Sequence, residues 1–279
     1  MSVEGPISIN VAQVLADRLG RKARWLPGFL VRALERLICQ QEMNELLAGA
    51  YPRRGAAFCE YVLEHLGVEL EVRGAENLPS SGRCIVAGNH PLGGLDGVSM
   101  LAWLSRQYSA SARFVVNDLL MAVDPLSESF IPINKHGSQS RAASASLDDA
   151  LSGGDPVVIY PAGLVSRLGK GGVVADLEWR KMFVNKAVES HRDIVPVFFD
   201  GLNSPSFYRL ARLRKRLGIK FNIEMVLLPR EIFRARGKRF VLTCGKPVPW
   251  QTLAGGASAT GEARRLREIV YSLNPQNKL

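Results

Sequence analysis

The chain has 279 residues, of which 47% are hydrophobic and 22% are charged, with a formal net charge of +10. This composition excludes a wholly disordered chain and fits one α/β domain with an added segment. No uncharged apolar run reaches the roughly 18 residues that would cross a bilayer, and the N-terminal MSVEGPISINVAQ does not resemble a signal peptide. The scattered cysteines show no metal-ligand spacing, so we expect buried thiols in a reducing cytoplasm and no metal: Cys39, Cys59, Cys84 and Cys244.

Residues 11–67 show helical periodicity, interrupted at Trp25-Leu26-Pro27-Gly28. Between Leu26 and Ile38 apolar residues recur at helical spacing, and charged residues fall between them. We therefore predict that residues 1–66 form an N-terminal helical segment that associates with a membrane.

Beyond Gly67, short β-branched runs alternate with helical segments. The predicted strands are 68–74, 84–88, 112–117, 156–161, 194–200, 221–228 and 239–245, and the predicted helices lie near 97–107, 139–152, 177–190 and 205–217. The alternation predicts an α/β domain at 67–279, with a mixed, mainly parallel sheet covered by helices. In such sheets, sites form where loops leave the carboxyl ends of strands.

One such loop is AGNHPLGGLDG (87–97), with His90 and Asp96 at its two ends. On a helix the two side chains would point apart, and on a strand they would be roughly 20 Å apart. They meet only if the loop folds back, and Pro91 with Gly93-Gly94 favours such a turn. An ionised Asp96 at a helix start would then fix the tautomer of His90 and leave one ring nitrogen to take a proton. The alternative is an ordinary helix cap at Asp96 and an inert loop histidine.

No serine or cysteine nucleophile stands in an elbow-type setting near this loop, which disfavours a covalent hydrolase. The role left for His90 is to deprotonate a substrate hydroxyl directly.

Further stretches follow this loop: FIPINKHG (130–137), YPAGLVSR (160–167), IVPVFFDGLNS (194–204) and CGKPVP (244–249). With NHPLGGLD they resemble, in order, the motifs of the glycerolipid acyltransferase family, which includes the lysophosphatidic acid acyltransferases. In that family the histidine activates an acceptor hydroxyl, which attacks an acyl thioester of CoA or acyl carrier protein, and the aspartate orients the histidine. The resemblance covers roughly residues 65–250 and implies the glycerolipid acyltransferase fold, His90 and Asp96 as catalytic residues, and no cofactor beyond the thioester co-substrate.

The resemblance also suggests substrate-binding residues, namely Asn89, Lys135, Arg141, Tyr160, Gly163, Ser166 and Arg167. A backbone N–H near Tyr160 and Gly163 would stabilise the oxyanion. Three departures stand out: the spacer between His90 and Asp96 has five residues instead of four, the third-motif glutamate is Ala162, and its arginine is Val165. In the second motif Lys135 stands near the position of the expected arginine.

The carboxylates of VVADLEWRK (173–181) are candidates to replace the missing glutamate or to meet a lipid headgroup. The favoured interpretation is a solvated helix start with Asp176 as its cap.

Losing the cation at Val165 removes a contact worth roughly 1.5–3 kcal/mol to a phosphate. NHPLGGLDG with YPAGLVSR is more similar to a bacterial branch, often labelled hemolysin-like, some of whose members O-acylate lyso-ornithine or lyso-glycine lipids. We therefore expect a lyso-aminolipid acceptor, with lysophosphatidic acid as the alternative, and a peripheral enzyme on the cytoplasmic side of the bacterial inner membrane.

The segment FYRLARLRKRLGIK (207–220) is basic and amphipathic, without an acidic residue, and fits an anionic membrane surface or an acidic acyl carrier protein. The predicted membrane-binding residues are Trp25, Phe29, Arg209, Arg212, Arg214, Lys215 and Arg216. No recognised nucleic-acid signature accompanies the charge, so we expect no nucleic-acid partner. A catalytically silent membrane-binding protein remains the second alternative, and the oligomeric state is not readable from the sequence.

Overall fold

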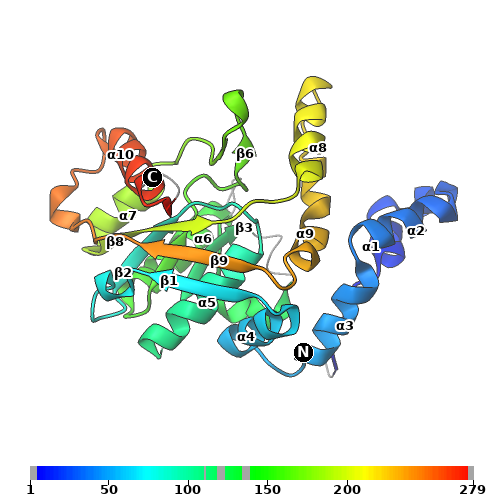
Figure 1. The fold of residues 1–279 in the computed structure, drawn as a ribbon, viewed down its shortest axis with the longest axis horizontal. Coiled ribbons are helices and arrows are strands. Elements are labelled where there is room, and N and C mark those ends of the chain that lie inside the picture. The colour runs from blue at the N-terminus through cyan, green and yellow to red at the C-terminus, as the bar shows by residue number, and fades with distance from the viewer. Residues whose placement is uncertain (1–4, 110, 118–122, 134–138, 276–279) are drawn as a thin grey trace.

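The structure, a computed structural model, describes residues 5–109, 111–117, 123–133 and 139–275. Its N-terminal part is helical, as predicted, with α1 (Val11–Leu19), η1 (Gly20–Trp25), α2 (Gly28–Leu37), α3 (Gln40–Ala50) and α4 (Gly55–Leu66). Helix α2 begins directly after Pro27, at the predicted break. Helices α1 to α3 project from the body as an arm (Figure 1), which joins the core through Leu46 and Ala50 at the end of α3, and α4 packs into the same core cluster.

The main sheet has seven strands: β1 (Glu69–Arg73), β2 (Cys84–Gly88), β3 (Arg113–Asn117), β4 (Phe130–Ile133), β5 (Val157–Ile159), β8 (Asp193–Asp200) and β9 (Arg239–Cys244). Their order across the sheet is β1-β9-β8-β2-β5-β3-β4. Every neighbouring pair is parallel except β8 and β9, so β1 and β9 run against the other five strands. The predicted mixed, mainly parallel sheet is confirmed, and β4 adds a strand that the sequence had not predicted.

Helices cover both faces of this sheet, and strand β2 shows why. All its residues are buried, and successive side chains point to opposite faces. Val86 joins a cluster with α4 and α5, whereas Ile85 and Ala87 join a second cluster with the helices of the other face. The remaining α-helices are α5 (Leu95–Tyr108), α6 (Gln139–Ser152), α7 (Met182–Ser190), α8 (Pro205–Arg216), α9 (Leu228–Arg234) and α10 (Ala259–Ser272).

Short elements complete the fold. A small antiparallel hairpin pairs β6 (Arg167–Leu168) with β7 (Val174–Ala175). The 3-10 helices are η2 (Ala75–Asn77), η4 (Asp124–Ser129), η5 (Lys170–Gly172), η6 (Ile223–Leu227) and η7 (Trp250–Thr252). Within the described ranges, no helix has the length and apolar character needed to span a membrane.

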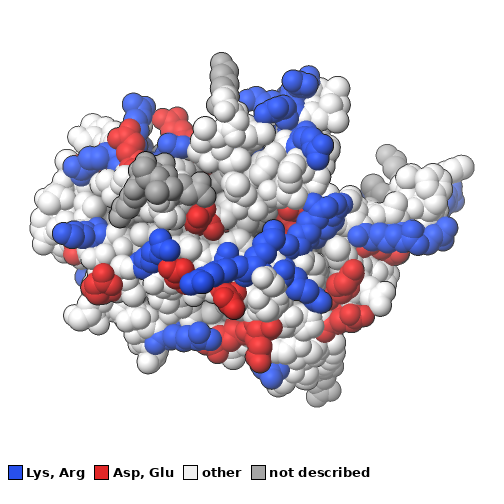
Figure 2. All heavy atoms as spheres, in the orientation of Figure 1, with Lys and Arg blue, Asp and Glu red and all other residues white. Residues whose placement is uncertain are grey.

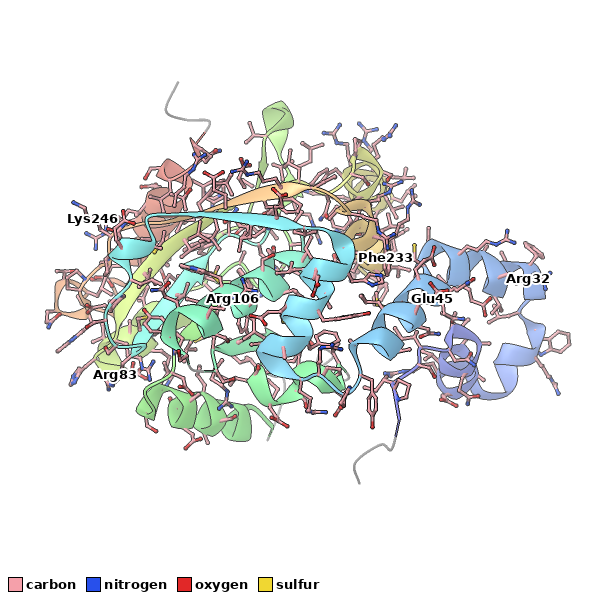
Figure 3. All side chains as sticks on the ribbon, turned by 60° about the horizontal axis from the view of Figure 1, so that its bottom comes forward. Arg32, Glu45, Arg83, Arg106, Phe233 and Lys246 are labelled. Atoms are coloured by element: carbon pink, nitrogen blue, oxygen red, sulfur yellow. The ribbon has the colours of Figure 1, made fainter. Side chains whose placement is uncertain are left out.

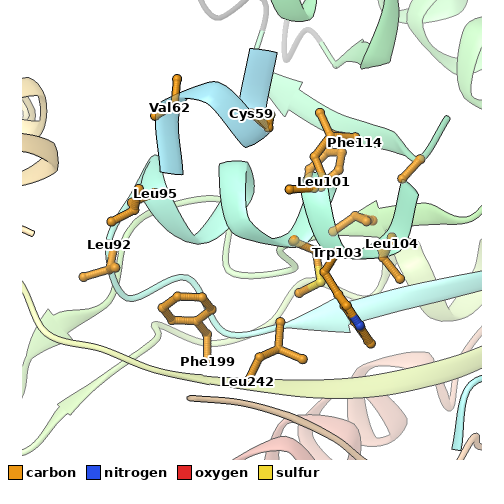
Figure 4. Close-up of a cluster of buried hydrophobic side chains, with 14 of the residues drawn as sticks. Cys59, Val62, Leu92, Leu95, Leu101, Trp103, Leu104, Phe114, Phe199 and Leu242 are labelled. Carbon is orange, nitrogen blue, oxygen red and sulfur yellow. The ribbon is translucent and has the colours of Figure 1, made fainter. Parts of the chain in front are cut away.

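The first core cluster anchors the loop that follows β2. Leu92 and Leu95 are buried at one end of this cluster, where Figure 4 shows them beside α5 and Phe199. Because these two side chains are held in the core, the residues between them have little freedom to move.

One predicted element was wrong, and a second is confirmed with a later start. Residues 221–228 are not a strand: they form η6 and the start of α9, where Pro229 occupies the first turn. A short apolar run fits a strand or a buried helix equally well, and here a buried Glu224 decides the outcome by pairing with two arginines. The helix predicted at 177–190 begins only at Met182.

Candidate active site

The site lies at the carboxyl end of β2, where the chain turns into α5. Asn89 is buried, and its side-chain oxygen accepts the Phe199 N–H at 2.7 Å while its amide donates to the Phe199 carbonyl at 2.9 Å. Asn89 was predicted to bind substrate, but in this structure both polar atoms of its amide hold the loop to β8. Asn203, which follows β8, donates to the Pro91 carbonyl at 3.0 Å and holds the loop two residues beyond Asn89.

His90 and Asp96 form the predicted pair. His90 Nδ1 lies 2.9 Å from Asp96 Oδ2, and the same oxygen accepts the backbone N–H groups of Leu92 and Gly93 at 3.0 and 3.3 Å. Asp96 is fully buried in the first turn of α5, which begins at Leu95, so Asp96 is not the cap that the alternative interpretation required. The turn that brings the two side chains together is confirmed.

The pair is electrostatically arranged for base catalysis. Burial would lower the pKa of His90, but the charge and hydrogen bond of Asp96 outweigh it and raise this pKa above its ordinary value. Burial would likewise raise the pKa of Asp96, yet His90 and the backbone N–H groups hold it below its usual range. With Nδ1–H donating to Asp96, a neutral ring leaves Nε2 as the proton acceptor, on a side chain that is 18% exposed.

Gly93 explains how the five-residue spacer folds. Its φ of +78° lies in the left-handed region, and a Cβ built there would come within 2.5 Å of the Val165 side chain and 2.9 Å of Leu228. Only glycine fits both the backbone conformation and the space.

Of the two residues predicted to lie near the reacting carbonyl, Tyr160 contacts His90 and Gly163 closes a turn. The Tyr160 ring stacks on His90, with centroids 4.2 Å apart and planes 16° apart. Burial, with the charges of Asp96 and Asp176, raises the pKa of Tyr160 far above its ordinary value, so its hydroxyl stays neutral. Gly163 closes a turn by donating its N–H to the Tyr160 carbonyl at 2.9 Å, so this particular N–H is already engaged within the protein.

Ser166 and Arg167 are both turned inward. Ser166 is buried, donates its hydroxyl to Asp176 and donates its N–H to the His90 carbonyl at 2.8 Å. The Arg167 guanidinium lies 3.0 Å from a fully buried Glu224. Neither side chain is presented to a substrate in this structure.

The third-motif departures create an apolar wall. Ala162 and Val165 are both buried, and Val165 belongs to a cluster with Phe207, Tyr208 and Leu227. Positions 162 and 165 therefore carry neither the carboxylate of the missing glutamate nor the positive charge of the missing arginine. Lys135 and the side chain of Arg141 lie outside the described residues.

Most predicted membrane-binding residues are on the surface. Trp25 and Phe29 of the arm are 76% and 63% exposed, and the exposed basic residues of α8 are Arg209, Arg212, Lys215 and Arg216. Arg214 differs, because its Nε lies 2.9 Å from Glu224 and its side chain is only 16% exposed. Figure 2 shows lysines and arginines gathered on the α8 end of the drawn face and in a band across it.

Asp176 was misread from the sequence. It is not a solvated helix cap but a buried carboxylate beside His90, outside any helix. Burial raises its pKa, although hydrogen bonds from Ser166, Trp179 and the His90 N–H oppose the rise. The tryptophan three residues later was the available signal, since a buried indole N–H requires an acceptor. Glu178, by contrast, is exposed and lies 3.6 Å from Arg264.

The His90–Asp96 pair has the arrangement of a base that activates a hydroxyl, and the chain belongs to the acyltransferase family: the family model described as acyltransferase matches residues 13–277. Two curated relatives are the lyso-glycine lipid O-acyltransferases of Phocaeicola vulgatus and Bacteroides thetaiotaomicron, 42% and 40% identical over 265 residues. The matches cover 95% of this chain and 95% and 97% of those proteins. The predicted membership of the glycerolipid acyltransferase superfamily and its lyso-aminolipid branch is confirmed.

A solved structure is also similar to this chain. It is the 1-acyl-sn-glycerophosphate acyltransferase PlsC from Thermotoga maritima, at 16% identity and a TM-score of 0.48, covering 90% of this chain and 94% of that one.

Proposed function

We propose that this acyltransferase moves a fatty acyl group from a CoA or acyl carrier protein thioester to the hydroxyl of a lyso-aminolipid. The observation that carries the proposal is the buried Asp96 holding His90 with Nε2 free to accept a proton, in a chain 40–42% identical to enzymes named for lyso-glycine lipids. Those names favour a glycine headgroup over an ornithine headgroup.

The chemistry follows from the orientation of the ring. Nε2 of neutral His90 accepts the proton of the acceptor hydroxyl while its oxygen attacks the thioester carbonyl carbon. Asp96 stabilises the resulting imidazolium. When the tetrahedral intermediate collapses, the C–S bond breaks and the departing thiolate takes the proton from Nε2, which restores the neutral ring.

The wall at Val165 supports an acceptor other than lysophosphatidic acid. A charge-assisted contact to phosphate would contribute roughly 1.5–3 kcal/mol, or about 10- to 100-fold in binding. Val165 is apolar and buried, and Arg167 is already paired with Glu224. Both residues therefore favour an acceptor whose recognition does not depend on a phosphate at this position.

A membrane surface is the proposed working environment. The exposed aromatic residues of the arm and the basic residues of α8 suit a lipid interface. In Figure 3, Arg32 lies at the outer end of the arm and Phe233 of α9 lies where the arm meets the body. The exposed basic residues of α8 would also suit an acidic acyl carrier protein that delivers the acyl chain.

Purified protein tests the proposal directly. Acyl-CoA and acyl carrier protein thioesters are offered with lyso-glycine lipid, lyso-ornithine lipid or lysophosphatidic acid in vesicles, and products are measured by mass spectrometry. We expect turnover of a lyso-aminolipid at least about 10-fold above that of lysophosphatidic acid.

The His90→Ala variant tests the proposed base. It should lose about 10²–10⁴-fold in rate while its vesicle binding persists. Faster acylation of lysophosphatidic acid, or full activity of His90→Ala, would reject the proposed acceptor or the proposed base, respectively.

A further inference from the structure

Asp176 connects the two segments that surround His90. Its side chain is buried, and Oδ1 accepts both the His90 N–H at 3.2 Å and the Ser166 hydroxyl at 2.5 Å. Oδ2 accepts the Trp179 indole N–H at 3.0 Å. One carboxylate thus accepts hydrogen bonds from three donors that lie on separate parts of the chain around His90.

The main chain of His90 is therefore fixed on both sides. Its N–H donates to Asp176, and its carbonyl accepts the N–H of Ser166, whose own hydroxyl returns to the same carboxylate. The ring is held separately, by Asp96 at Nδ1 and by stacking on Tyr160.

Helix α10 holds Asp176 in turn. The Tyr271 hydroxyl accepts the Asp176 N–H at 2.6 Å, and Arg267 donates to the Asp176 carbonyl at 2.8 Å. The carboxylate thus has a fixed position relative to the sheet, as a group that orients a catalytic base requires.

Taking the proposed function as its basis, we propose that Asp176 is a positioning residue that sets the place of His90 relative to Asp96 and the acceptor hydroxyl. It acts through the His90 main chain and touches neither the substrate nor the reacting atoms. A displacement of about 1 Å at a catalytic base can cost 10²-fold in rate, so we expect a loss of that order when this anchor is removed.

The charge of Asp176 also acts on His90. Asp96 and Asp176 both raise the pKa of His90, while burial and Arg167 lower it, and Tyr160 stays neutral. Removing the Asp176 charge therefore lowers the pKa of His90, an effect that a purely structural residue far from the ring would not produce.

Asp176→Asn is the informative change because it keeps the shape and removes the charge. The amide presents one acceptor and one donor, so whichever way it turns, its NH₂ faces a group that donates in the native structure. We expect kcat to fall about 10²-fold with KM for the lyso-lipid changed less than about twofold. The acidic inflection of the kcat/KM profile should move to lower pH. Glu178→Gln, an exposed carboxylate two positions away, should match the native enzyme in all three quantities.

A double variant distinguishes a residue that positions His90 from one that only stabilises the fold. In a His90→Ala background, adding Asp176→Asn should cause no further loss, since Asp176 acts only through His90. A further loss of 10²-fold there, or native kcat and inflection in the single variant, would overturn the proposal. Both results leave the proposed function standing, whereas absence of acyl transfer by the native enzyme would reject that function first.

Ser166→Ala keeps the test valid if Asp176→Asn does not fold. It removes one donor to the carboxylate and leaves the charge, so kcat should fall about 10-fold with the pH inflection unmoved. A native kcat in a folded Ser166→Ala protein, alongside an unfolded Asp176→Asn, would make Asp176 a residue of stability only and would overturn the proposal.

Discussion

His90 must be neutral to accept a proton, so its pKa sets the pH dependence of the reaction. Asp96 raises this pKa above the ordinary value of about 6.5, and the rate should therefore fall as pH drops through an inflection above that value. Asp96→Asn removes the charge and the tautomer control. The acidic inflection of the profile of kcat/KM against pH should move to lower pH. The value of kcat should fall by about 10²–10⁴-fold. An inflection that does not move would contradict the pairing of these two residues.

Gly93 gives a second test at the scale of single residues. Gly93→Ala places a methyl group within 2.5 Å of Val165 at a φ of +78°, so the loop must shift and activity should drop by about 10²-fold or more. Gly94→Ala is the matched control, because its Cβ meets Ile232 at 3.4 Å with a negative φ and should cost far less. Equal activity of the two variants in the acyl-transfer assay would contradict the geometry of the turn.

The contact between His90 and Asp96 was predictable from residue types and spacing, because a glycine-rich turn is the means by which residues 90 and 96 can meet. The catalytic roles of the two residues came instead from the resemblance to the acyltransferase motifs. The place of Asp176 was not predictable, since it lies 86 positions from His90 and local sequence does not reveal contacts between distant segments. For the same reason the inward pairing of Arg167 with Glu224 was invisible from the third motif alone.

Among the elements, α8, η6 and the β6 segment meet at a buried ion pair network. Glu224 is fully buried, and its two oxygens lie 3.0 Å from Arg167 and 2.9 Å from Arg214. These pairs fix the basic helix α8 to the segment that contains Val165 and Ser166.

Glu224→Gln tests this network. It leaves two partly buried guanidinium groups without their counter-charge and should lower the free energy of unfolding by about 3–5 kcal/mol. The comparison is Glu128→Gln, whose carboxylate is 79% exposed beside Arg54 and which should cost at most about 1 kcal/mol. Chemical denaturation measures both, and equal unfolding free energies would contradict the role given to Glu224.

Element type was predictable where length and periodicity agreed, as in β8 and α5. It was not predictable at 221–228, where a buried charge and Pro229 outweighed a strand-like composition. Helix α10 carries an ordinary amphipathic pattern, but its role in holding Asp176 depends on tertiary packing.

At the scale of the whole molecule, one apolar cluster joins the arm to the site. It contains Val165, Phe207, Tyr208 and Leu227, with Leu37 of the arm packed against it. The surface proposed to meet the membrane and the wall proposed to set acceptor preference are therefore parts of one packed unit.

Vesicle binding tests the orientation of the molecule on lipid. Lys215→Gln removes an exposed charge from α8 and should weaken binding to anionic vesicles by about 1 kcal/mol, or about fivefold, at moderate salt. Lys246→Gln is the matched control, because Lys246 is exposed at the opposite end of the molecule from the arm in Figure 3. The two variants should converge near 1 M salt, where charges are screened beyond about 3 Å. Equal weakening by Lys246→Gln would place the membrane on another face.

The central claim is that the His90–Asp96 pair completes a diacylated aminolipid, and lipid mass spectrometry of cells tests it most directly. Cells without the gene should lose the diacylated aminolipid and accumulate its lyso form, and the native gene should reverse both changes whereas His90→Ala should not. Unchanged aminolipids with accumulation of lysophosphatidic acid, or full restoration by His90→Ala, would contradict the account.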